Sequence, residues 1–384
     1  MAVVLMLCCL SACGKKNDDA SAEKTIRIGV FEPTSGNSGA GGKKETIGIQ
    51  YAYSKNSTIE IDGETYDIEL VYADNASDSR KAVQAAKELV KKNVSVVIGS
   101  YGSRVSIAAS DVFRDAQVPV IGATCTNPAV TQDNSHYFRI CFNDSLQGEA
   151  LASFAAGKLS ALKAYCLGEA DNEYDHGLIG FFSKAFENAG GKTVTDFFSK
   201  DNSDFSYYIN KAKSEDCDVI FCPVSITYAV QIINQASKLD VNIPVLGADT
   251  FDDNAVLAAA KGTDIRLYTS SFCAQSIGNG FETGVRNYIS NNINAELANG
   301  SDDTVSAVTA MGYDAYGVAL EAVRIADSAD SAKIMKALPK VIYTGISGPI
   351  MFDKAGDAVR DTVYIKSADT ISGTWLTETQ QISG

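Results

Sequence analysis

A sharp turn between a buried strand and a helix is the first place where this chain could bind a small anion. The segment Gly99-Ser100-Tyr101-Gly102-Ser103 follows the mostly apolar run 94–98, which is typical of a buried parallel strand. A helix that starts at Ser103 offers free backbone N–H groups and the positive end of its dipole, and both attract a carboxylate or a phosphate. The alternative is a plain turn in which Ser103 only caps the helix.

A second turn of the same kind follows the next apolar run, 118–122. It reads Ala123-Thr124-Cys125-Thr126-Asn127-Pro128, and proline is favoured in the first turn of a helix. Thr126 is therefore placed to cap a helix, and its hydroxyl together with the free N–H groups could complete a cradle for a carboxylate. Capping alone, without a ligand, is an equally good interpretation.

Two further polar side chains are of interest in the second half of the chain. Asp249 follows the apolar strand expected at 243–247 and could bind an ammonium group, or it could cap a helix that begins near residue 252. Tyr174, in the segment Asn172-Glu173-Tyr174-Asp175, stands near a helix start and could cover a ligand. A half-buried structural tyrosine fits the same pattern.

No residues with the spacing of a catalytic or metal site accompany these turns. The segment 74–78 lacks the glycine and the glutamate that a calcium loop needs at its sixth and twelfth positions. His136 and His176 have no cysteine or carboxylate at metal-ligand spacing, and no Gly-x-Ser-x-Gly nucleophile elbow occurs. The sequence therefore predicts a binding protein without catalysis, metal or cofactor.

The elements that must position these residues alternate between strands and helices, which predicts an α/β fold. Ligands of open parallel sheets bind outside the carboxyl ends of the strands, where these turns lie. Two successive series of about 120 residues each predict two similar lobes. A loop is expected at the glycine-rich stretch 33–42. Strands are expected at 26–31, 67–72, 94–98, 118–122, 163–168, 192–197, 218–222, 243–247 and 266–272, and helices at 43–56, 79–92, 103–116, 146–160, 175–190, 204–213, 227–238, 253–260 and 304–326.

The N-terminal segment indicates export. Residues 2–10 form an uncharged apolar run that is too short to span a bilayer, which needs about 20 apolar residues. Its end, Leu10-Ser11-Ala12-Cys13, resembles a bacterial lipoprotein signal, in which residues 1–12 are removed and Cys13 is lipidated. The polar stretch 13–24 would then be a flexible tether. A buried N-terminal strand is the alternative.

Charge and cysteine content add two constraints. The 33 Lys and Arg residues against 47 Asp and Glu give a net charge of −14, which argues against a nucleic-acid partner because phosphate binding needs a basic surface. Six cysteines lie downstream of Cys13, mostly in apolar runs, and we expect them to be buried as small apolar residues. At least one disulfide is the alternative in an exported protein. These six are Cys125, Cys141, Cys166, Cys217, Cys222 and Cys273.

The order and spacing of these segments resemble one known family. Further segments that carry the resemblance are 28–36, 73–82, 313–317 and 348–353. Over residues 25–370 the chain is similar to the amino-acid-binding proteins of bacterial ABC importers, of the leucine/isoleucine/valine type, which have the type I periplasmic-binding fold.

The resemblance implies two Rossmann-like lobes with parallel central sheets. Three hinge crossings, near residues 141–145, 272–276 and 349–354, would join the lobes and let them close over a ligand. The first lobe would comprise residues 25–143 plus 274–351. The second lobe would comprise residues 144–273 plus 352–384.

The resemblance also assigns roles at the ligand's carboxylate. In this family the loops after the third and fourth strands hold that group. The corresponding positions here are Ser103, with Tyr101 and Gly102 beside it, and Thr126.

Three more roles concern the ligand's ammonium group and the covering of the cleft. The resemblance implies a main-chain acceptor at Thr124, an acidic partner at Asp249 and a covering aromatic at Tyr174. Two positions depart from the family, because the run Gly39–Gly42 and Ser225 stand where the family often has aromatic residues. These departures indicate a roomier or more polar pocket than a purely branched-chain site.

The function implied is that of an extracytoplasmic lipoprotein, anchored to the bacterial cell membrane through Cys13. Such a protein captures an amino acid of the branched-chain or aliphatic type and delivers it to an ABC transporter permease, and it is expected to act as a monomer. The alternative is a sensing receptor for an amide, a short peptide or another small polar solute, coupled to a signalling partner.

Overall fold

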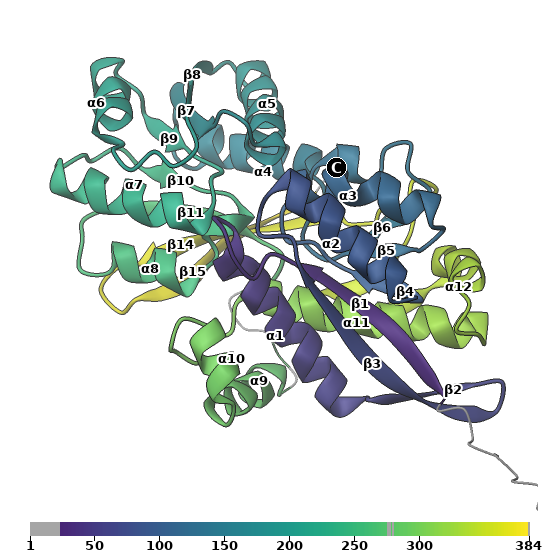
Figure 1. Cartoon of the computed structure of the whole chain (residues 1–384). Helices are drawn as coiled ribbons and strands as arrows, with labels where there is room; N and C mark the ends of the chain where they lie inside the picture. The colour runs from purple at the N-terminus through teal and green to yellow at the C-terminus, as the bar shows by residue number, and fades with distance from the viewer. Residues whose placement is uncertain (1–23, 275–277, 279, 383–384) are drawn as a thin grey trace, which may run out of the picture.

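Two sheets covered by helices organise the chain in this computed structural model, which describes residues 24–274, 278 and 280–382 (Figure 1). The first sheet has six strands in the order β2-β3-β1-β4-β5-β6, and all neighbours run parallel except the hairpin β2–β3. Its strands are β1 (Thr25–Glu32), β2 (Thr58–Ile61), β3 (Glu64–Asp74), β4 (Val96–Ile98), β5 (Val120–Gly122) and β6 (Tyr137–Arg139).

Helices cover this first sheet on both faces. Two helices pack against each other on one face, and a second pair packs together on the other (Figure 1). The first pair is α1 (Gly39–Lys55) and α11 (Ala307–Ala326), and the second pair is α2 (Ser79–Lys91) and α3 (Ser103–Asp115). Asp78 caps α2 as the sequence predicts, because its carboxylate accepts hydrogen bonds from the N–H groups of Arg80 and Lys81.

The second sheet has seven strands in the order β15-β14-β11-β10-β9-β7-β8. Five of them run parallel, and β14 and β15 add an antiparallel edge. The strands are β7 (Lys163–Glu169), β8 (Lys192–Phe198), β9 (Val219–Phe221), β10 (Val245–Leu246), β11 (Leu267–Ser271), β14 (Thr362–Asp369) and β15 (Thr374–Ile382). The helices of this lobe are α4 (Asp144–Gly157), α5 (Glu173–Asn188), α6 (Ser206–Ser214), α7 (Ile226–Lys238) and α8 (Asn254–Ala260).

The α/β fold with two lobes is confirmed, and the predicted elements lie within a few residues of those observed. The prediction did not include several short or peripheral elements. These are β2, β6, β14 and β15, together with α9 (Phe281–Ser290), α10 (Ile293–Ala298), α12 (Ser331–Ala337), β12 (Ile342–Gly345), β13 (Gly348–Met351) and the 3-10 helices η2 (Asp249–Phe251) and η3 (Leu338–Lys340). The helix start expected at Pro128 is the 3-10 helix η1 (Pro128–Val130).

The glycine-rich stretch 33–42 is not wholly a loop, because α1 begins at Gly39. The helix starts there since its glycines allow close packing. A side chain at Gly41 would overlap the ring of Tyr101, and one at Gly42 would overlap Pro33. Only Gly36, at φ +78°, needs the left-handed backbone that glycine adopts without strain. Counting glycines alone therefore gave the wrong start for this helix.

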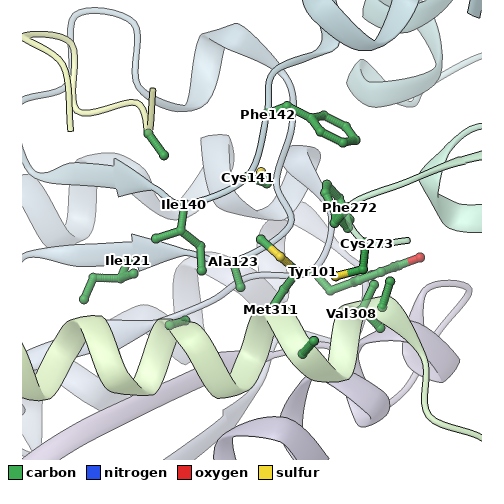
Figure 2. Packing of buried hydrophobic residues seen from close by; sticks show 14 of the residues in the cluster. Tyr101, Ile121, Ala123, Ile140, Cys141, Phe142, Phe272, Cys273, Val308 and Met311 are labelled. Carbon is green, nitrogen blue, oxygen red and sulfur yellow. The ribbon is translucent and has the colours of Figure 1, made fainter. Parts of the chain in front are cut away.

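The chain passes between the two sheets after β6, after β11 and after β13, at the places that the resemblance implied. Phe142 and Phe272, from the first two crossings, lie 4.6 Å apart between ring centroids. Figure 2 shows these rings close together, above the helix α11 that carries Val308 and Met311. The hinge thus has an apolar core shared by both lobes. The residue bounds of the two lobes stay a prediction.

All six cysteines downstream of Cys13 are buried and free, so the interpretation as small core residues is confirmed and no disulfide links them. The predicted signal 1–12, the lipidated Cys13 and nearly all of the predicted tether 13–24 lie outside the described residues. Within residues 24–274, 278 and 280–382, no helix is both long enough and apolar enough to cross a membrane.

We expect Gly48→Ala to destabilise the first lobe. A Cβ at Gly48 would overlap the carbonyl oxygen of Thr309, so α1 and α11 would have to separate. The expected loss is on the order of 1–3 kcal/mol in urea unfolding, despite alanine's better helix propensity. The matched control is Gly180→Ala in α5, where no atom lies within 4 Å of the new Cβ. That variant should be up to about 1 kcal/mol more stable than the parent. Equal behaviour of the two variants would contradict close packing at Gly48.

Candidate functional site

A cleft between the two lobes is lined by loops at the carboxyl ends of strands from both sheets. It encloses about 680 Å³ including its open mouth. Six of the seven residues predicted to bind a ligand line it, and they come from both lobes. These are Tyr101, Gly102, Ser103, Thr124, Tyr174 and Asp249.

The start of α3 supplies the first-lobe wall of the cleft. Gly102 is the N-cap, at φ +101°, and α3 begins at Ser103 without a side-chain cap. The Ser103 hydroxyl accepts a hydrogen bond of 3.1 Å from the backbone N–H of Asn127, which fixes the two ligand loops against each other. The first-turn N–H groups and the positive end of the helix dipole therefore face a cleft where an anion is stabilised.

Thr126 differs from its predicted role. It is fully buried, it does not line the cleft, and its hydroxyl has no hydrogen-bond partner among the described residues. The cap of the short helix η1 is Asn127, whose side chain accepts from the N–H of Ala129 at 2.9 Å. The prediction that Thr126 caps this helix is wrong, because η1 begins at Pro128 and its N-cap is therefore the residue directly before it, Asn127.

Asp249 is the acidic group of the second lobe. Its carboxylate accepts hydrogen bonds from the Tyr174 hydroxyl at 2.7 Å and from Gln147 Nε2 at 2.5 Å. Asp249 is 3% exposed, and no described Lys or Arg forms an ion pair with it. Burial raises the pKa of Asp249 from 3.8 to about 7. The alternative role of Asp249 as a helix cap is wrong, because Asp253 caps α8.

Tyr174 lies at the start of α5, directly after the N-cap Asn172 and Glu173. Its ring is buried and its hydroxyl is held by Asp249, so it is not the half-buried structural tyrosine that the alternative proposed. Gln147 in α4 was missed by the sequence analysis. Its amide donates to both Asp249 and Ser270 Oγ, so it fixes the orientation of the carboxylate.

Contacts between the lobes hold the cleft in a closed arrangement. Lys44 in α1 forms a buried ion pair of 2.5 Å with Asp253 of the second lobe. Arg104 in α3 donates to the carbonyl oxygen of Asp171 at 2.9 Å, and Asn37 donates to the Tyr228 hydroxyl at 2.9 Å. A ligand in this arrangement would be enclosed by groups of both lobes.

A model of periplasmic binding proteins matches residues 25–370. The chain belongs to the periplasmic binding protein family. Members of this family are substrate-binding proteins of transporters and not enzymes, and the family implies a location outside the cytoplasm.

Individual relatives agree with this assignment. The chain is 28% identical to the Leu/Ile/Val-binding protein homolog 2 of Brucella abortus over 358 residues, which cover 91% of each chain. The crystal structure of the leucine-binding protein LivK from Thermotoga maritima superposes with a TM-score of 0.81 at 28% identity, over 93% of this chain and 99% of the other. The branched-chain amino acid transporter substrate-binding protein LivJ from Streptococcus pneumoniae, solved with isoleucine, gives a TM-score of 0.78 at 26% identity, over 94% and 99%.

Behind the first-lobe wall of this binding protein lies a pair of buried carboxyl groups that the sequence analysis missed. Glu32 Oε2 accepts from the backbone N–H of Tyr101 at 2.7 Å, and Glu45 Oε2 accepts from the Thr124 hydroxyl at 2.5 Å. Burial raises the pKa of both groups, for Glu45 from 4.5 to about 7, and the repulsion of Glu45 raises that of Glu32 further. In the sequence, the one indication of this pair was that an acidic residue, Glu32, ends an apolar strand.

We expect the ligand-free protein to lose stability as the pH rises from about 4.5 to about 7. The folded state holds protons on Glu45 and Asp249 in this range, whereas the unfolded chain has released them, so a higher pH favours unfolding. Glu45→Gln mimics the protonated acid and should reduce the loss by on the order of 1–3 kcal/mol. Urea unfolding at pH 5 and pH 8 measures it. An equal pH dependence in Glu45→Gln and the parent would show that Glu45 is ionised throughout.

Proposed function

We propose that this chain is an extracytoplasmic solute-binding protein that captures an amino acid in the cleft and delivers it to an ABC importer. The proposal covers binding by the α-carboxylate and α-ammonium groups, without any chemical conversion. The observation that carries it is the polarity of the cleft. A helix start with free N–H groups faces it from one lobe, and a buried carboxylate without a cation faces it from the other.

Each end of the cleft matches one charge of an amino acid. A carboxylate next to Ser103 would accept N–H donors from the first turn of α3 and interact with the helix dipole. An ammonium group next to Asp249 would add a positive charge to a desolvated carboxylate that has only neutral hydrogen-bond donors. The main-chain oxygen of Thr124 is the proposed second acceptor for the ammonium, since the Thr124 hydroxyl is already bonded to Glu45. Because the two charges contact different lobes, binding favours closure.

Branched-chain and aliphatic amino acids are the ligands that the named relatives suggest, and they form the first set of probes. The permease as partner, the action as a monomer and the lipid anchor are further parts of the proposal. They rest on the family and on the segment Leu10-Ser11-Ala12-Cys13.

We expect Asp249→Asn to weaken amino-acid binding by about 30-fold or more. The substitution keeps the shape of the side chain but leaves the ligand's ammonium group without its counter-charge. A thermal-shift screen of the twenty amino acids selects the ligand, since a ligand at 100 times its Kd adds about 2.7 kcal/mol of stability. Calorimetry then compares the affinities of the variant and the parent.

The matched control is Asp240→Asn, the same substitution at an exposed position with positive φ. Its affinity should equal that of the parent. The deaminated analogue of the ligand provides a second control, because its affinity should not depend on Asp249. The site would be refuted if Asp249→Asn bound the amino acid as tightly as Asp240→Asn.

We expect Cys13→Ser to release the protein from the membrane fraction of an expressing bacterium. Serine cannot carry the thioether-linked lipid, and the polar tether gives no other reason to bind a bilayer. Immunoblots of separated membrane and soluble fractions measure the distribution. Retention of the variant in the membrane fraction would contradict lipidation at Cys13 without affecting the proposed ligand.

A further inference from the structure

Most residues that line the cleft, besides those assigned to the charged groups of an amino acid, carry a polar group. This inference rests on the proposed function and narrows its ligand. Once Ser103, Thr124 and Asp249 are assigned to the charged groups of an amino acid, the other described lining residues must contact its side chain. Among these, Val105 is aliphatic, Gly102 has no side chain, and Tyr101 and Tyr174 combine an aromatic ring with a hydroxyl. The rest carry hydroxyl, amide or charged groups.

Two buried polar groups of the lining, the Ser225 hydroxyl and the Glu169 carboxylate, have few or no partners. Ser225 is 8% exposed, and no described residue hydrogen-bonds to its hydroxyl. Glu169 is 4% exposed, and the hydrogen bond described for its carboxylate is a long one of 3.5 Å from Asn172 Nδ2. Burial raises the pKa of Glu169, against a weaker lowering by the charge of Arg104. Both groups line the cleft, so a ligand that fills it would remove water from them.

The described hydrogen bonds of two other lining residues, Arg104 and Asn37, are directed away from Glu169 and Ser225. Arg104 donates to the carbonyl oxygens of Ser77 at 2.8 Å and Asp171 at 2.9 Å. Asn37 Nδ2 donates to the Tyr228 hydroxyl. The long contact from Asn172 is the one hydrogen bond described for the Glu169 carboxylate, so a donor on the ligand would satisfy this group. The Ser225 hydroxyl, which can donate or accept, would pair with a polar group of the same ligand.

We propose that the cleft selects an amino acid whose side chain carries N–H or O–H donors, such as a carboxamide or a hydroxyl, over a branched aliphatic one. An aliphatic side chain would leave Glu169 and Ser225 desolvated and unpaired. A site built to bond a polar group rejects an apolar analogue more strongly than an apolar pocket rejects a polar one. Ser225 and Glu169 are thus the residues that determine specificity.

Three pairs of amino acids with matched shape or length test this selection on the mature protein. Asparagine and leucine branch identically, threonine and valine do too, and glutamine and methionine have equal length. Calorimetry of all six should show the polar member binding at least about tenfold more tightly within the pair that binds best. Equal or tighter binding of the aliphatic member overturns the inference and leaves the proposed function intact. Absence of binding by all twenty amino acids overturns both.

Two variants connect the selection to its residues. Ser225→Ala removes one acceptor and should reduce the polar-over-apolar ratio by about threefold to tenfold. Its control is Ser214→Ala, an exposed position outside the cleft, which should leave the ratio unchanged. Glu169→Gln keeps the size of the side chain and should reduce the ratio in the same direction. An unchanged ratio in both cleft variants, with native thermal unfolding, overturns the assignment to these residues.

Discussion

The arrangement of this molecule depends on a carboxylate that is buried between two lobes without a cation. Asp249 is held by two neutral donors, Tyr174 and Gln147, and burial raises its pKa to about 7. An ionised carboxylate in such a place is costly unless an opposite charge accompanies it. On the proposed function, closure around an ammonium group would supply that charge, whereas closure around nothing favours the protonated acid. The closed state would then be more stable with a ligand than without one, as a capture protein requires.

The fold brings the strand ends of both sheets to one cleft, and hydrogen bonds from outside the cleft fix the loops that follow these strands. Arg139, fully buried in β6, donates to the carbonyl oxygens of Cys125 and Asn127 and pairs with Asp357 at the third crossing. The loop that carries Thr124 is thereby tied to the hinge. On the other side, the hydrogen bond between Glu32 and Tyr101 fixes the loop before α3. Arg139 and Glu32 do not line the cleft, but their hydrogen bonds fix the loops that carry the proposed ligand-binding residues.

Local patterns predicted most of what lies at the ends of strands. Apolar runs followed by small or polar residues located the turns that carry Ser103, Thr124 and Asp249. A buried parallel strand is apolar along its length, so the first polar residues after it mark the turn at its carboxyl end. The failures have a different cause. The start of α1 at Gly39, and the contacts of Gln147 and Glu45, depend on residues between 60 and 123 positions away in the chain. No local pattern records such contacts. The cap of η1 is a different case, because Pro128 at the first helical position makes Asn127 the N-cap, and this rule can be read from the sequence.

The fold constrains the two parts of the cleft to different degrees. The end assigned to the charged groups is built from a helix start, a main-chain oxygen and one carboxylate, features that the doubly wound topology itself places at the strand ends. The residues assigned to the side chain include Ser225, the N-cap of α7, and Glu169, the last residue of β7, and the fold does not constrain either position to one residue type. At 28% identity to the named relatives, a shared fold leaves most individual residue types free to differ. Membership of the family therefore bears on the class of ligand, whereas the polar lining of this cleft bears on its side chain.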